Sequence, residues 1–171
     1  MIRVLVVDDH PIVRQGLVAI LEDEADFAVV GAAGSADEAV ALVGRLHPDV
    51  VLLDLELGDE DGVAAIPRLA EASPAGRVIV FTAYDTDERV FGALRAGAKG
   101  YLLKGAPTEE IARAIRAVHG GGSHLEPRVA AKVLDGMGRA GRGAVLSGRE
   151  REVLRLIAAG QSTKEMARSL A

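Results

Sequence analysis

The sequence contains no cysteine and no tryptophan, and its aromatic residues are limited to two tyrosines and three phenylalanines. The absence of cysteine excludes a disulfide framework and any thiolate metal site. No apolar run approaches the roughly 20 residues that a membrane span needs. The first residues also turn acidic too early for a secretory signal peptide. We therefore expect a soluble, cytoplasmic protein with no membrane partner.

What the sequence does contain is a large aliphatic fraction, 49% hydrophobic residues in a chain of 171. That length accommodates one ordinary domain and part of a second. Charge is divided unevenly: residues 1–120 carry 20 acids against 11 Lys and Arg, whereas residues 121–171 carry 5 acids against 9. A basic C-terminal part is typical of a segment that meets a polyanion. On charge alone, a solvated basic surface explains it equally well.

Short apolar runs alternate with segments of helical periodicity five times over residues 1–120. This alternation predicts an α/β fold with a doubly wound, five-stranded parallel sheet and helices on both faces. The run Val50–Leu53 has four consecutive apolar β-formers, as expected of a strand buried on both faces. The predicted strands are 2–7, 27–30, 50–53, 77–81 and 101–103, and Gly31–Gly34 is predicted to be a turn. The capping-box spacings Ser35/Glu38 and Asp85/Glu88 predict that helices begin at Ser35 and Asp85.

Polar side chains follow the predicted strands at the points where the strands end. Asp8 and Asp9 follow the first strand, Asp54 the third, Thr82 the fourth and Lys104 the fifth. Parallel α/β sheets bind ligands beyond the carboxyl ends of their strands. Gathered carboxylates repel one another unless a cation joins them, and hard oxygen ligands favour Mg²⁺. A carboxylate nucleophile, a divalent metal and an ammonium group together indicate phosphoryl transfer onto Asp54.

Each of these residues also has an ordinary structural explanation when it is taken singly. Asp8 and Asp9 have the chemistry of helix N-caps. Thr82 is typical of a strand-end turn, and Lys104 of a solvated charge. The functional interpretation depends on their joint placement at one edge. The four histidines show no metal-ligand or triad spacing and are interpreted as surface or capping residues: His10, His47, His119 and His124.

The strand-end set, together with Tyr101-Leu102-Leu103-Lys104, resembles the receiver domain of bacterial two-component response regulators. The string Gly97–Lys104 and the segment Leu146–Leu154 are similar to the NarL/FixJ subfamily, whose output is a LuxR-type helix-turn-helix. The resemblance implies a receiver at residues 1–120, a linker with one helix at 121–146, and the first part of a LuxR-type domain at 147–171. A helix from Pro127 and a flexible basic linker from Gly136 are expected in the middle segment.

The resemblance also implies a role for each site residue. Asp54 is the phosphoacceptor, Asp9 ligates Mg²⁺ directly, and Asp8 helps either directly or through water. The remaining implied roles are the Glu56 carbonyl as a further metal ligand, Lys104 on the phosphoryl group, Thr82 and Tyr101 as switch residues, and Glu56 and Tyr84 as tuners of phosphate lifetime.

Two departures from the family pattern are visible. Leu57-Gly58 stands where the family often has Met-Pro, which predicts a looser loop beside the site. Thr163 stands where the family usually has Asn. Ser162, Thr163 and Lys164 are candidates for DNA phosphate contacts. The recognition helix would follow them and is absent from these 171 residues, so we expect specific DNA binding of the full-length protein and not of this chain.

The predicted function is therefore that of a non-enzymatic response regulator. A sensor histidine kinase phosphorylates Asp54 with Mg²⁺ as cofactor, and the altered surface favours a homodimer and controls transcription through a DNA-binding domain. Two alternatives remain open from the sequence. One is an aspartyl-nucleophile phosphatase that uses Asp54-Leu55-Glu56. The other is a phosphorylation-independent docking module.

Overall fold

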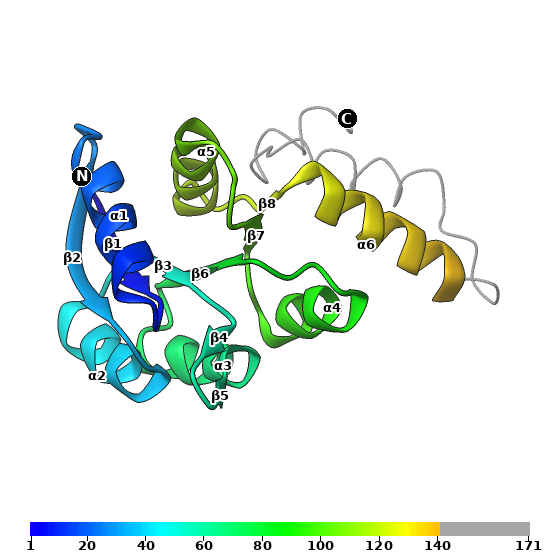
Figure 1. Cartoon of the computed structure of the whole chain (residues 1–171), viewed down its shortest axis with the longest axis horizontal. Helices are drawn as coiled ribbons and strands as arrows, with labels where there is room; N and C mark the ends of the chain where they lie inside the picture. Colours follow the sequence, from blue (N-terminus) through cyan, green and yellow to red (C-terminus); the bar gives the residue numbers. More distant parts are fainter. Residues whose placement is uncertain (141–171) are drawn as a thin grey trace.

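The computed structural model describes residues 1–140 of the chain, and the side chains of residues 1–136. Its centre is a parallel sheet in the order β2-β1-β3-β6-β7-β8 with helices on both faces (Figure 1). The doubly wound α/β architecture predicted from the sequence is confirmed. The strand count is corrected, because the parallel sheet of the described part has six strands rather than five.

The strands and helices follow one another closely along the chain. In order they are β1 Ile2–Val7, α1 Pro11–Glu22, β2 Phe27–Ala33, α2 Ala36–Leu46, β3 Val50–Leu53, β4 Glu56–Leu57, β5 Glu60–Asp61, α3 Gly62–Ala72, β6 Arg77–Thr82, α4 Asp87–Ala96, β7 Gly100–Leu103, α5 Thr108–His119, β8 His124–Leu125 and α6 Pro127–Ala140.

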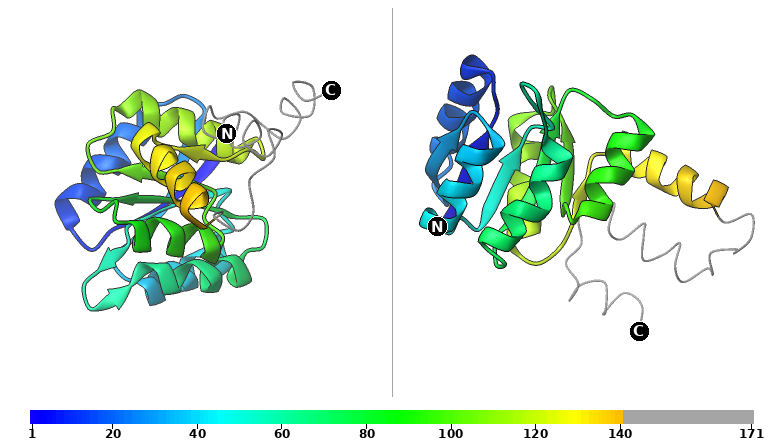
Figure 2. Two further views of the ribbon diagram at one scale, coloured as in Figure 1. Left: turned by 90° about the vertical axis from the view of Figure 1, so that its right-hand side faces the viewer. Right: turned by 90° about the horizontal axis from the view of Figure 1, so that it is seen from below.

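Both faces of the sheet are buried, which explains why its central strands are continuous apolar runs. Helices α2, α3 and α4 cover one face, and α1 and α5 cover the other (Figure 2). Alternate residues of β1 divide between the two cores: Leu5 and Val7 face the first, and Val4 and Val6 face the second. The sheet is thereby fixed in register, so that the residue after each strand is placed at a defined point of the carboxyl edge.

Two predicted boundaries are wrong at the level of single residues. Strand β2 runs on to Ala33, so residues 31–33 of the predicted turn belong to the sheet. Helix α4 is capped by Thr86, whose hydroxyl accepts from the amide of Arg89, and not by Asp85. The predicted cap of α2 is confirmed, since the Ser35 hydroxyl accepts from the amide of Glu38.

The largest departures lie after residue 120. The sixth strand, β8, has only two residues and pairs with β7. Helix α6 continues to Ala140, past Gly136, where a flexible linker was predicted. It packs against α4, and a Cβ at Gly136 would overlap the ring of Phe91. Glycine at this position therefore permits close helix packing rather than ending the helix.

Candidate functional site

The carboxyl ends of β1 and β3 are neighbours, and they bring Asp8 and Asp54 together as predicted. The amide of Asp54 donates to the Val7 carbonyl at 2.9 Å, and the amide of Asp8 donates to the Ala33 carbonyl at 3.1 Å. These bonds continue the sheet ladder by one residue and fix both backbones. Both aspartates are buried: Asp8 is 1% exposed and Asp54 is 3% exposed. Buried carboxylates of this kind require positive partners.

The positive partner is Lys104, the residue that follows β7. Its Nζ lies 2.6 Å from Asp54 Oδ2 and 2.7 Å from Asp8 Oδ2. Burial acts to lower the pKa of Lys104, but the bonds to Asp54 and Asp8 outweigh it and hold that pKa above its usual value. The ammonium group is therefore charged at neutral pH and bridges two carboxylates that come from different strands.

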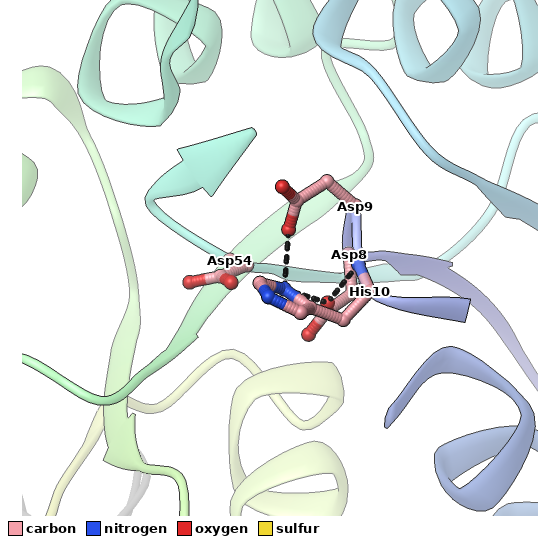
Figure 3. A group of neighbouring side chains, drawn as sticks. All are labelled: Asp8, Asp9, His10 and Asp54. Atoms are coloured by element: carbon pink, nitrogen blue, oxygen red, sulfur yellow. Dashed lines mark hydrogen bonds and ion pairs between the residues drawn. The ribbon is translucent and has the colours of Figure 1, made fainter. Parts of the chain in front are cut away.

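Asp9 and His10 complete the group of side chains shown in Figure 3. Asp9 Oδ2 accepts from the amide of Gly58 at 3.0 Å, and Asp9 Oδ1 lies 2.7 Å from His10 Nδ1. The His10 amide also donates to Asp8 Oδ1 at 2.8 Å. His10 is exposed, yet its ring reaches the acidic cluster. Its exposure and its position as the N-cap residue of α1 agree with its interpretation as a surface or capping residue, but its contact with the acidic cluster is one that the sequence did not predict.

The loop that carries Leu57 and Gly58 is more ordered than the sequence predicted. Residues 56–57 and 60–61 form the two-stranded antiparallel hairpin β4–β5 beside the site. Gly58 lies in its turn with φ 66°, a left-handed conformation that glycine adopts without strain. The same residue supplies the amide bonded to Asp9. Gly58 therefore anchors the loop to the site instead of loosening it.

The donor set fits a hard divalent cation. One ligand atom from each of Asp8, Asp9, His10 and Asp54 lies within 4.8 Å of the others. Two buried oxygens, Asp8 Oδ2 and Asp9 Oδ1, make ion-pair contacts with Lys104 and His10 and have no other partner among the described residues. Carboxylate oxygens that converge in this way suit Mg²⁺. Glu56 contacts the site through its backbone amide, which donates to Asp54 Oδ1 at 3.3 Å.

Of the candidate switch residues, Thr82 is the last residue of β6 and Tyr101 is the second residue of β7. Thr82 is fully buried, and its hydroxyl has no hydrogen-bond partner among the described residues. Tyr101 is also fully buried, and its hydroxyl donates to the Tyr84 carbonyl at 2.7 Å. Burial raises the pKa of Tyr101 to about 12. The side chain of Tyr84 itself is exposed.

Sequence reasoning missed Arg89 as a neighbour of the site. Its Nη1 donates to the Leu55 carbonyl at 3.3 Å and lies 3.7 Å from Asp61 Oδ1. Arg89 thereby ties the start of α4 to the residue that follows Asp54. An arginine in the first turn of a helix carries no sequence signal for such a contact.

The remaining predicted residues lie elsewhere. Ser162, Thr163 and Lys164 fall outside the residues that the structure describes. His124 is largely buried in β8, with Nε2 3.5 Å from Glu110 Oε1, so its interpretation as a surface or capping residue is wrong. No helix in residues 1–140 is long and apolar enough to cross a membrane.

Comparison with known proteins assigns both parts of the chain. Residues 4–116 match the model of the response regulator receiver domain, and residues 144–171 match that of the luxR family of bacterial regulatory proteins. The transcriptional regulatory protein LiaR of Bacillus subtilis is 42% identical over 99% of this chain and 82% of its own length. The oxygen regulatory protein NreC of Staphylococcus carnosus is 35% identical over 98% and 82%.

Solved structures agree with these matches. A LuxR-family two-component response regulator from Aurantimonas sp. SI85-9A1 is 34% identical, with a TM-score of 0.74 over 78% of this chain and 96% of its own. The receiver domain of RcsB from Salmonella enterica, solved with the phosphomimetic BeF3−, is 25% identical, with a TM-score of 0.70 over 77% and 97%. The relatives are regulators, which favours the main functional prediction over the phosphatase and docking-module alternatives. The chain belongs to the two-component response regulators, with a receiver domain followed by sequence of the LuxR-type DNA-binding family.

Proposed function

We propose that Asp54 is the residue that this response regulator phosphorylates, and that its phosphoryl donor is a sensor histidine kinase. One observation carries the proposal: the buried Asp54 carboxylate at the end of β3 lies 2.6 Å from the half-buried Lys104 ammonium at the end of β7. In the reaction an Asp54 oxygen attacks phosphorus, the bond from phosphorus to the donor's imidazole nitrogen breaks, and that nitrogen leaves with the electron pair. After the transfer, the Lys104 ammonium binds the phosphoryl oxygens, which now carry the negative charge.

The metal in this proposal is Mg²⁺, held by the carboxylates of Asp8, Asp9 and Asp54 and by the Glu56 carbonyl. When bound, it supplies positive charge that offsets the repulsion between an incoming phosphoryl group and the acids. The chain itself positions the nucleophile. The amide bond to Val7 fixes the Asp54 backbone, and the hairpin amide of Gly58 holds Asp9. These fixed groups reduce the reorganisation that the reaction requires.

The proposed consequence is a change at the surface formed by α4, β7 and α5. Thr82 and Tyr101 are the switch residues, because Thr82 ends β6, which lies between β3 and β7 in the sheet, and Tyr101 belongs to β7 itself. The free hydroxyl of Thr82 is the buried donor available to a new anion. The bond between Tyr101 and the Tyr84 carbonyl changes when the loop after β6 moves. The altered surface favours a homodimer, and through it the full-length protein binds DNA and regulates transcription.

The test is chemical modification of the whole chain by acetyl phosphate. We expect mass spectrometry to find one added phosphoryl group in Mg²⁺, and none after the metal is removed with EDTA. Light scattering of the same samples, and of samples with beryllofluoride, measures whether the site's occupancy changes the molecular mass. Modification that proceeds equally well in EDTA would contradict the proposed metal role.

Replacing Lys104 by methionine is expected to raise the affinity for Mg²⁺ about tenfold, because the ammonium group now neutralises the oxygens that the cation needs. The same change is expected to weaken beryllofluoride binding, since the group that would hold its fluorines is lost. Both affinities are measurable by titration calorimetry. Lys99→Met is the matched control, because Lys99 is exposed. Unchanged Mg²⁺ affinity of Lys104→Met would show that ammonium and cation do not compete.

A further inference from the structure

The outer edge of β7 is completed by a side chain rather than by a strand. Its inner edge pairs with β6 along the whole strand, but its outer edge pairs with β8 at only two positions, Gly100 and Tyr101. The β8 ladder ends where the amide of Glu126 donates to the Tyr101 carbonyl at 3.0 Å. Two residues further along β7, the amide of Leu103 donates to Glu126 Oε2, also at 3.0 Å. The Glu126 carboxylate therefore takes the place of a further strand residue at this point of the edge. Figure 1 shows β8 beside β7, followed by α6.

The amide held by Glu126 belongs to the residue immediately before Lys104. On the opposite edge of the strand, the amide of Lys104 donates to the Thr82 carbonyl at 2.7 Å. The backbone of residues 103–104 is thus fixed from both edges. From this anchored backbone the Lys104 side chain extends to Asp54 and Asp8. A shift of about 1 Å in such a group is enough to impair a reaction that depends on positioning.

We propose that Glu126 is a positioning residue for Lys104, and that through it the docking of α6 regulates phosphorylation of the receiver. The inference rests on the proposed function of Asp54 and adds to it a residue that lies outside the receiver-family match at residues 4–116. Glu126 directly precedes α6, and its carbonyl accepts the first helical bond from Ala130 at 2.9 Å. Movement of the helix therefore moves the carboxylate that holds Leu103.

Helix α6 is docked firmly enough to place this carboxylate. Val129 and Val133 are buried in the same core as α4, and Lys132 Nζ lies 3.5 Å from Asp85 Oδ2 and 3.8 Å from Asp87 Oδ1. A partner or domain that pulls α6 from this surface withdraws Glu126 and loosens Lys104. By thermodynamic reciprocity, a phosphoryl group that engages Lys104 changes the strength of α6 docking by the same factor. Since α6 leads from the receiver toward the LuxR-type sequence, this contact links the site to the output.

Two substitutions separate positioning from a simple capping or charge role. Glu126→Gln keeps a carbonyl oxygen at the same reach but removes the charge. Glu126→Asp keeps the charge and is a better helix N-cap, but it is one methylene shorter and does not reach the Leu103 amide. A positioning role predicts that Gln behaves like the wild type and Asp like Glu126→Ala. A capping or charge role predicts the reverse order.

The experiment measures beryllofluoride and Mg²⁺ affinity of the whole chain by calorimetry, together with hydrogen exchange of the Leu103 amide by NMR. We expect Glu126→Ala and Glu126→Asp to bind beryllofluoride about fivefold more weakly, the order of effect of one lost hydrogen bond, and to exchange the Leu103 amide faster. Their Mg²⁺ affinity should not fall, because no oxygen of the cation site is moved and a loosened Lys104 competes less with the cation for the oxygens of Asp8 and Asp54. Glu110→Gln is the control, since it removes a neighbouring carboxylate whose ion-pair partner is His124 of β8.

The outcomes are distinguishable from failure of the proposed function. If wild-type protein does not bind beryllofluoride in Mg²⁺, the role of Asp54 is wrong. If wild type binds and Glu126→Asp binds equally well, or Glu126→Gln is as impaired as Glu126→Ala, the positioning role of Glu126 is overturned while that of Asp54 stands. Equal losses of beryllofluoride and Mg²⁺ affinity would show a general disturbance of the site and would likewise overturn it.

Discussion

Asp54→Asn is expected to abolish phosphorylation by acetyl phosphate, with a loss of at least about 100-fold in rate. The amide is nearly isosteric with the carboxylate, so the main-chain bond to Val7 and the packing of β3 are retained. What is lost is the nucleophilic anion, because an amide oxygen is a far weaker nucleophile. Lys104 keeps its contact with Asp8, which prevents an unpaired charge from being left in the site. Phosphoryl incorporation, followed by mass spectrometry at fixed Mg²⁺, measures the effect.

Asp59→Asn is the matched control for this substitution. Asp59 is exposed in the turn between β4 and β5 and is close in the chain to Asp54. Its replacement by asparagine removes the same charge as Asp54→Asn does. We expect it to react at the wild-type rate. Phosphorylation of Asp54→Asn at a rate comparable with Asp59→Asn would mean that another acid is the acceptor, and the proposed function would then be wrong.

The part of the site that was predictable from sequence is the part that depends on strand ends. Asp8, Asp54 and Lys104 each follow a run of apolar residues, as expected for a strand that is buried on both faces of the sheet. Parallel strands present their carboxyl ends at one edge, so adjacency follows from fold class without knowledge of any distance. The structure brings these three side chains into contact for that reason.

The part that was not predictable depends on contacts between segments with no periodic pattern. Strands β4, β5 and β8 have two residues each, too few for an alternation to be recognised. The contact of Glu126 with Leu103 spans 23 residues of sequence. Arg89 and His10 contact the site through side-chain reach alone. Such contacts arise from tertiary geometry, and no local preference of these residues predicts them.

Gly136 is a further position at which a tertiary contact overrides the local prediction. Gly136 lies in a segment rich in glycine and arginine, whose composition predicts a flexible linker. In the folded chain, the absence of its Cβ allows α6 to approach Phe91, and the helix continues. Glycine lowers the stability of an isolated helix, and a prediction from composition takes only this effect into account. In the folded chain, close packing of α6 against α4 offsets the loss of stability.

Gly62→Ala is expected to destabilise the protein by about 3 kcal/mol, at the upper end of the usual cost of overpacking a core. Gly62 begins α3, and its amide donates to the Leu55 carbonyl at 3.0 Å. A Cβ on Gly62 would lie 2.6 Å from both the Asp54 carbonyl oxygen and Leu55 Cα. These are backbone atoms, which cannot rotate away as a flexible side chain does, so α3 or the end of β3 must move.

Because the atoms in conflict include the backbone of Asp54, the same substitution is expected to reduce reactivity toward acetyl phosphate along with stability. Urea unfolding measures the first effect and phosphoryl incorporation the second. Gly44→Ala is the control: Gly44 is an exposed residue within α2, a Cβ there meets no atom within 4 Å, and alanine should stabilise the helix by about 0.5–1 kcal/mol. If Gly62→Ala matched Gly44→Ala in both measurements, the end of β3 would be loose enough to accommodate a methyl group. A phosphoacceptor on so loose a backbone would not be held in place for reaction, so the rigidity of residues 54–55 is the property on which the proposed chemistry depends.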